Sequence, residues 1–329
     1  MLRWGGFRRA FELIKLKAPP RRLVVVIDEF SYLLLADKNT PAVFQAIIDE
    51  KLDDRFFLIL GGSLLGLMEG LMGGYTNPLY GRRTAQLKLK PPLGFFHVAE
   101  YFRDKPVETV VKIYSVTGGV PMYFRLFRGD DFGRELLETA FSSTSILYEE
   151  PEFILREELR EVHRYYIILE AMASGKHRLS EIAHWAGIEA KDMPKYLRTL
   201  ISLDLVRREV PVTESKRSRK ARYYLKDRFF EFWFRFVKPN RGGRVEIGTF
   251  EMDWEAFNTY VGKAFEEISR QFLLELNKTN GLPFRFTKIG RWWHKKEEID
   301  LVALNEREKK ALFIEVKWKE LGKGSGREF

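Results

Sequence analysis

The stretch LVVVIDEF, residues 23–30, decides the fold class of this chain. Its five aliphatic residues in a row are typical of a strand that is buried on both faces, as in a parallel α/β sheet. The run ends abruptly in two carboxylates, Asp28 and Glu29, which such a strand delivers at its C-terminal tip. The sequence therefore predicts an α/β domain with an acidic pair at the edge of its sheet.

Two further strands are predicted after this one. Residues 55–60 (RFFLIL) form a second apolar run, which ends in two glycines and Ser63. Residues 85–89 predict a third strand. The motif PLYGRRT before it brings Arg82 and Arg83, and paired arginines suit phosphate recognition because a guanidinium group donates hydrogen bonds in a planar fork.

The order IDEF, LGGS, PLYGRRT and then GGVP (residues 118–121) resembles the archaeal ATPase family, within the STAND-like branch of AAA-related P-loop ATPases. The resemblance continues over nearly the whole chain. It implies that Asp28 holds Mg²⁺ on the phosphates of ATP, that Glu29 polarises the attacking water and that Ser63 senses the γ-phosphate. It also implies that four further residues lie near the nucleotide: Arg82, Arg83, Gly119 and Pro121.

The phosphate loop of these ATPases, G-x-x-x-x-G-K-[ST], does not occur in the 329 residues. Without it the phosphates lose their main cradle, so we do not expect this chain alone to hydrolyse ATP. If the missing strand belongs between the strands at 23–27 and 55–60, these would stand about 9–10 Å apart, two strand spacings. Residues 1–130 are therefore expected to form a truncated ATPase domain, or one that a partner chain or a local rearrangement completes.

Residues 131–240 predict a helical segment followed by a winged helix. Three helical patterns precede two strand patterns, at 131–174, 179–188, 192–205, 205–210 and 221–225. Between Leu205 and Arg228, nine basic residues stand against three acidic ones, a net charge of +6. Such a local excess suggests a polyanion partner, most simply DNA.

In a DNA-bound winged helix, the second helix of the pair faces the major groove and the hairpin loop contacts phosphates. The candidate groove residues are Lys191, Lys195 and Arg198. The candidate phosphate contacts in the loop are Lys216, Arg217, Arg219 and Lys220. Winged helices also dock proteins, and a charged hairpin tip is often only solvated, so both alternatives stay open.

Residues 245–329 carry a second set of acids. A helix predicted over residues 255–276 contains Glu266, and strands at 298–304 and 311–318 predict a hairpin. If the hairpin folds symmetrically about its turn, the opposed pairs are Leu301 with Ile314, Val302 with Phe313, and Asp300 with Glu315. Lys317 then projects beside Glu315, because side chains two apart share a face.

Two opposed carboxylates destabilise a sheet unless a cation lies between them. The arrangement therefore predicts Mg²⁺ or Mn²⁺ held by Asp300, Glu315 and the Val316 carbonyl, with Lys317 orienting or deprotonating a water that attacks a phosphodiester. This pattern resembles the PD-(D/E)xK nuclease fold, which implies that Glu266 is the helical acid of the metal site. The alternative is that Glu315 and Lys317 lie on a solvated strand edge.

The composition limits the compartment and the class. The chain has a net charge of +10, 45% hydrophobic residues and no cysteine, which excludes disulfides and cysteine-based zinc sites. The charge-rich, cysteine-free composition fits a cytoplasmic location. No apolar run approaches the roughly 18 residues that span a bilayer, so we expect no membrane partner.

The sequence thus predicts an α/β protein with a partial P-loop ATPase sheet, a winged helix and a restriction-endonuclease-like α/β domain. The favoured function is that of a DNA-associated protein of the ATPase family with a metal-dependent nuclease-like C-terminal domain. The alternatives are a non-catalytic DNA-binding or regulatory module and a truncated gene product without independent activity.

Overall fold

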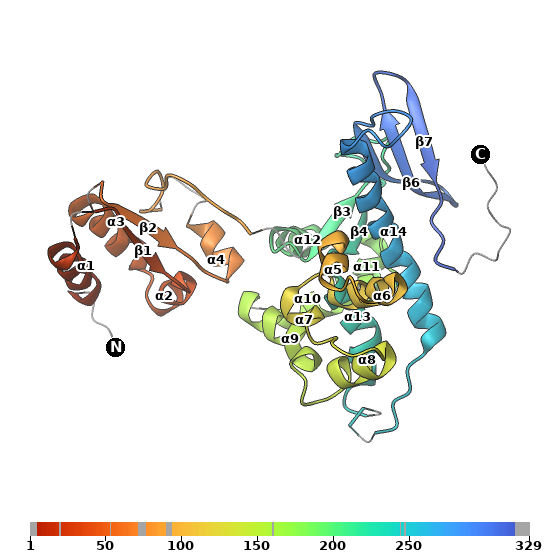
Figure 1. Cartoon of the computed structure of the whole chain (residues 1–329), viewed down its shortest axis with the longest axis horizontal. Helices are drawn as coiled ribbons and strands as arrows, with labels where there is room; N and C mark the ends of the chain where they lie inside the picture. The colour runs from red at the N-terminus through yellow and green to blue at the C-terminus, as the bar shows by residue number, and fades with distance from the viewer. Residues whose placement is uncertain are drawn as a thin grey trace. The chain divides into compact units, whose positions relative to one another are not determined.

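A computed structural model describes two compact units, Met1–Leu89 and Lys90–Phe329, each with its own core. Together they form a mixed α/β protein with small sheets and many helices (Figure 1). The first unit ends well before residue 130, where the motifs placed the end of the first domain. Residues 320–329 of the expected third domain lie outside the described ranges, which are 5–19, 21–52, 54–71, 77–89, 94–159, 161–243, 245–246 and 248–319.

The first unit is built around two parallel strands. Its elements are α1 (Gly5–Lys17), β1 (Leu23–Ile27), α2 (Phe30–Ala36), α3 (Thr40–Lys51), β2 (Phe56–Leu60) and α4 (Leu65–Gly70). The strands pair directly, with Leu23 opposite Phe56 and Ile27 opposite Leu60. The expected gap of two strand spacings is therefore wrong, because each strand supplies the backbone hydrogen-bond partners of the other.

Only one face of this sheet is covered within the described residues. Val25, Ile27, Leu58 and Leu60 pack against a core that includes Phe11, Phe30 and Phe44, and Figure 1 shows α1 and α3 side by side next to the strands. The alternate residues Val24, Val26, Phe57 and Ile59 are 40–60% exposed. The expectation of burial on both faces is wrong here, because no described element lies over that second face.

Residues 85–89 form no strand, contrary to the prediction from their alternating pattern. Leu87 and Leu89 are largely exposed, so the alternation has no apolar surface to pack against among the described residues.

The second unit begins with helices that the sequence had assigned to the ATPase domain. These are α5 (Phe95–Tyr101), α6 (Val107–Thr117) and α7 (Pro121–Phe124). They share one hydrophobic core with α13 (Arg228–Phe232) and α14 (Trp254–Lys278) of the same unit. The segment at 131–174, predicted to be helical, contains three helices: α8 (Phe132–Ala140), α9 (Ile146–Glu158) and α10 (Val162–Ala173).

Three consecutive helices and a hairpin form the middle of this unit. After α10 come α11 (Leu179–Ala186), α12 (Met193–Ser202), β3 (Val206–Glu209) and β4 (Arg222–Leu225), and the two strands are antiparallel. The aromatic run that follows continues from α13 into a π-helical turn η1 (Trp233–Val237) and a 3₁₀ turn η2 (Lys238–Asn240). Phe229, Phe232 and Trp233 are fully buried there, so this run belongs to the core.

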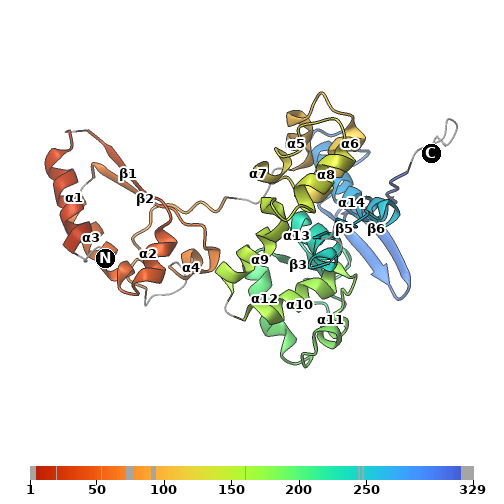
Figure 2. The same cartoon turned by 90° about the horizontal axis from the view of Figure 1, so that it is seen from below.

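The C-terminal sheet packs against the long helix α14, as Figure 2 shows from below. Its antiparallel strands are β5 (Lys288–His294), β6 (Glu297–Asn305) and β7 (Lys310–Ile314), in that order. Leu301 lies opposite Ile314 and Val302 opposite Phe313, which confirms the predicted register. No helix in the described residues is long and apolar enough to cross a membrane.

Candidate functional site

The first unit brings the acidic tip of β1 next to the tip of β2. Glu29 has a left-handed backbone (φ 51°) at the start of α2, and its carboxylate accepts a hydrogen bond of 2.8 Å from the Ser63 hydroxyl. Asp28 turns one carboxylate oxygen back to accept from the Glu29 amide at 3.0 Å. Three of the predicted nucleotide-site residues therefore lie together, because parallel strands end at the same edge.

The predicted phosphate-binding arginines are engaged elsewhere. Arg82 donates two hydrogen bonds to Asp49 of α3, at 2.8 and 2.7 Å, and a third to the Pro78 carbonyl. This fork lowers the pKa of Asp49. Arg83 donates to Gln86 at 2.6 Å. Arg82 is thus positioned by α3 rather than by the acidic tip of β1.

Gly119 and Pro121, the remaining residues of the implied nucleotide site, belong to the second unit. Gly119 has a positive φ of 82° in the turn after α6, and Pro121 begins α7. In this position they shape a helix–helix turn within the core of that unit.

The three residues predicted to face the DNA groove have different surroundings. Lys191 precedes α12, so its placement on that helix is wrong, and its ammonium group pairs with Glu189 at 2.6 Å. Lys195 lies on α12 with its ammonium group 5.4 Å from the centre of the Tyr196 ring. Arg198, also on α12, is exposed and has no carboxylate partner among the described residues.

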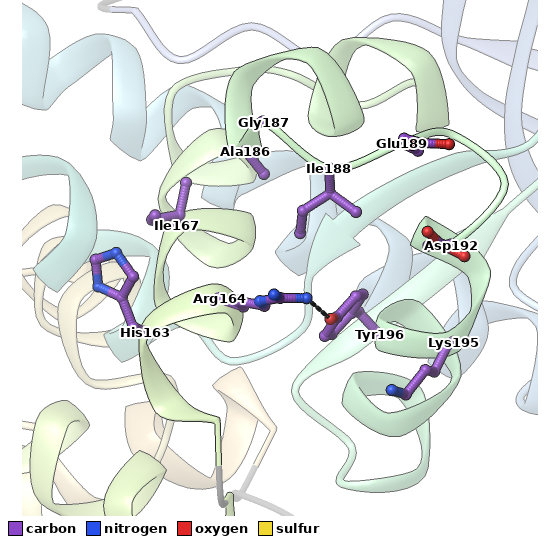
Figure 3. Close-up of a pocket in the computed structure, with 10 residues that line it drawn as sticks. All are labelled: His163, Arg164, Ile167, Ala186, Gly187, Ile188, Glu189, Asp192, Lys195 and Tyr196. Carbon is purple, nitrogen blue, oxygen red and sulfur yellow. Dashed lines mark hydrogen bonds between the residues drawn. The ribbon is translucent and has the colours of Figure 1, made fainter.

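A pocket of about 600 Å³ lies between α10 and the start of α12 (Figure 3). Arg164 donates to the Tyr196 hydroxyl across it, and its rim carries Glu189 and Asp192. Sequence reasoning missed this pocket because its wall is assembled from helices that each read as an ordinary amphipathic segment.

The hairpin loop is held in shape by Arg208 of β3. Its guanidinium group donates to the carbonyls of Lys216 and Ser218, at 2.6 and 2.7 Å. Lys220 pairs with Glu214 at 2.5 Å. The other predicted phosphate contacts of the loop are exposed and, within the part of the chain that the structure describes, have no carboxylate partner: Lys216, Arg217 and Arg219.

The hairpin loop also joins the C-terminal sheet, which the sequence did not predict. The Val212 amide donates to the Arg291 carbonyl at 2.9 Å, and the Trp293 indole donates to the Lys220 carbonyl at 3.2 Å. Arg222 pairs with Glu298 at 2.8 Å and lies over the Trp293 ring at 4.5 Å. The loop and the sheet therefore form one packed structure.

The predicted metal site is only partly assembled. Asp300 and Glu315 are not a ladder pair, because β7 ends at Ile314 and Asp300 instead accepts from the Val316 amide at 2.8 Å. Glu266 is paired with Arg291, and burial nevertheless raises the pKa of its carboxyl group. Glu315 is exposed and paired with Lys317, whose pKa is raised chiefly by that contact.

These residues do not fit a divalent cation as they stand. Glu266 already has a cationic partner, one oxygen of Asp300 is used by the backbone, and Glu315 is turned to Lys317. Among the described residues no group of three His, Cys, Asp or Glu side chains could hold a metal ion.

Comparison with known proteins identifies the family. Residues 233–329 match the family DUF234, described as archaea bacterial proteins of unknown function. Over 304 residues the chain is 42% identical to Uncharacterized protein MJECL04 of Methanocaldococcus jannaschii, a match that spans 91% of this chain and 68% of that protein. The chain belongs to the same protein family as this archaeal relative.

Proposed function

We propose that the second unit is a DNA-binding module of the winged-helix type. The observation that carries the proposal is a set of exposed cations without carboxylate partners, within the described part of the chain, on α12 and in the hairpin loop: Arg198, Lys216, Arg217 and Arg219. An unpaired surface guanidinium or ammonium group is free to replace the counterions of a phosphate backbone. The loop's anchorage to β5 supports this role, because a loop held in one shape loses less entropy on binding.

The test is the salt dependence of binding to duplex DNA by the full chain, measured by fluorescence anisotropy. Replacing Arg217 and Arg219 by Gln is expected to weaken binding and to reduce the salt slope by roughly one for each phosphate that is no longer neutralised. Replacing the exposed Arg9 and Arg103 by Gln removes the same net charge and serves as the control. If both double variants weakened DNA binding equally, the effect would be due to net charge alone, which would contradict the proposal.

A second candidate is metal-dependent cleavage of DNA by the C-terminal sheet. The pairing of Leu301 with Ile314 and the hydrogen bond from the Val316 amide to Asp300 favour it, because they place Asp300 beside the segment that carries Glu315 and Lys317. Because Glu266 is held by Arg291, the carboxylates would have to rearrange before Mg²⁺ or Mn²⁺ could bind. Cleavage of plasmid DNA that depends on the metal and disappears in both Asp300→Ala and Lys317→Ala supports this activity. Binding without cleavage assigns the module a non-catalytic role.

A nucleotide role for the first unit is supported by the hydrogen bond between Glu29 and Ser63 beside Asp28. ATP with Mg²⁺ would need a phosphate cradle that these residues do not supply, so we propose that a further polypeptide segment or a partner chain completes this site. Equilibrium dialysis of ATP against the full chain tests whether the acidic tip alone retains it. Binding by this chain alone, lost in Asp28→Asn, would contradict the need for a completing segment.

A further inference from the structure

A second cavity lies at the junction of β3, α14 and β5. Its volume is about 210 Å³, and four arginines line it: Arg207, Arg228, Arg270 and Arg291. Three glutamates share the lining: Glu209, Glu266 and Glu267. The cavity is thus rich in charge, although it lies between packed elements where charges are costly to bury.

The exposures of these side chains distinguish the floor of the cavity from its mouth. Arg228 is 8% exposed and Arg270 is 38% exposed, so Arg228 marks the floor and Arg270 the mouth. Arg228 pairs with Glu231 at 2.7 Å and Arg270 with Glu267 at 3.0 Å, while Arg291 pairs with Glu266. These pairs hold the guanidinium groups in place and leave part of their donor capacity unused, because each group has five N–H donors.

Three buried side-chain atoms at or beside this junction have no hydrogen-bond partner in the described structure: Arg207 Nε, Glu209 Oε2 and Tyr224 Oη. Arg207 Nε lies 2.7 Å from Glu209 Oε1, but without the geometry of a hydrogen bond. A buried polar atom without a partner costs about 1–3 kcal/mol, so an occupant is favoured that offers a proton to Glu209 Oε2 and an acceptor oxygen to the arginines.

We propose that this cavity binds a phosphate group that carries a protonated oxygen, either inorganic phosphate or a phosphate monoester. Guanidinium forks match phosphate oxygens, and several of them around one tetrahedral anion can each donate to a different oxygen. The P–OH group supplies the donor that Glu209 Oε2 lacks. Sulfate has the same shape but no proton at neutral pH, so its oxygen would face the carboxylate without a hydrogen between them. This site does not depend on the DNA-binding proposal.

The test compares phosphate with sulfate, using the full chain and isothermal titration calorimetry at constant ionic strength. Phosphate is expected to bind at least about tenfold more tightly than sulfate, a factor worth about 1.4 kcal/mol. Glu209→Gln is isosteric and replaces the acceptor by a donor, so the preference for phosphate should be lost while sulfate binding improves. Arg270→Gln, at the exposed mouth, should weaken both anions about tenfold.

Arg134→Gln is the matched control, because Arg134 is also an exposed helix arginine paired with a glutamate on its own helix, and it lies outside the cavity. It should change neither affinity. Equal affinities for phosphate and sulfate in the wild-type chain, an unchanged preference in Glu209→Gln, or no detectable phosphate binding would each overturn the proposal.

Two sources of the phosphate can be separated with the same variants. Near pH 6, where a monoester is partly protonated, a 5′-phosphorylated oligonucleotide is compared with its 5′-hydroxyl counterpart and with a nucleoside monophosphate. A gain from the 5′-phosphate that vanishes in Glu209→Gln assigns a nucleic-acid end. Glu209-dependent binding of only the mononucleotide or inorganic phosphate assigns a free ligand.

Discussion

At the residue scale, one buried hydroxyl group of the second unit is satisfied by two partners that are distant in the sequence. The Tyr260 hydroxyl of α14 is fully buried and lies 2.7 Å from the Ser115 carbonyl and 2.9 Å from the Arg228 carbonyl. One phenol therefore ties together the ends of α6 and α13. Burial also keeps its pKa well above the usual value, so it remains a neutral donor.

Tyr260→Phe should reduce the free energy of unfolding of the second unit by about 1–3 kcal/mol, because two buried carbonyl groups lose a donor. Urea denaturation at neutral pH measures the change. Tyr101→Phe, at an exposed tyrosine, is the control and should have little effect. Equal stability of Tyr260→Phe and the wild-type chain would mean that the carbonyls find other partners.

The carboxyl group of Glu246 makes the free energy of unfolding depend on pH in the acidic range. Its hydrogen bond with the Tyr148 hydroxyl, together with backbone donors such as the Gly243 amide, lowers its pKa to about 2 from 4.5. A depressed carboxyl pKa stabilises the folded state above pH 4.5, and that contribution is lost as the pH falls toward 2. Between pH 4.5 and pH 2, the midpoint of unfolding should therefore fall less steeply with decreasing pH for Glu246→Gln than for the wild-type chain. Parallel curves would contradict the assignment.

At the scale of elements, the amino-acid sequence was sufficient to predict the register of the β6–β7 hairpin. The turn at Asn305–Lys310 and the apolar alternation on either side leave one pairing that keeps Leu301 and Ile314 on the core face. β1 and β2 were also recognised from clear apolar runs, but the sequence did not predict that they pair directly with each other. A strand's own residues indicate that it is buried, whereas its neighbour depends on how the chain crosses over.

The turn between β6 and β7 contains one residue with a strained backbone conformation. Lys309 has a φ of 52°, which costs an L-residue about 1–2 kcal/mol relative to glycine. Lys309→Gly should therefore stabilise the C-terminal sheet by roughly 1 kcal/mol, with the greater freedom of glycine in the unfolded chain offsetting part of the gain. Hydrogen exchange of the β6 and β7 amides measures it. Lys310→Gly, inside β7, is the control and should destabilise the same amides.

At the scale of the whole molecule, the two cores should melt independently. The first unit is centred on residues such as Phe44 and the second on residues such as Phe257, and both side chains are fully buried. Phe44→Ala is expected to destabilise only the first transition, by about 3–5 kcal/mol, and Phe257→Ala only the second. Scanning calorimetry of the full chain resolves the two. A single transition lowered by either change would show that the units unfold as one.

Local structure could be predicted from the amino-acid sequence alone. Apolar runs marked β1 and β2, and the order of two helices and a hairpin was evident between residues 179 and 225. These features follow from side chains that are close in the chain, where period and turn chemistry act directly. The tip residues Glu29 and Ser63 met because parallel strands end at one edge.

The choice of charged partners, in contrast, emerged only in the folded chain. Arg82 pairs with Asp49 and Arg291 with Glu266, over separations of 33 and 25 residues, and the Trp293 indole donates to a carbonyl 73 residues away. The cavity at Glu209 arises in the same way, where a hairpin, a helix and a sheet meet. Ion pairs and cavities depend on the angle and depth at which elements dock, and no single segment carries that information.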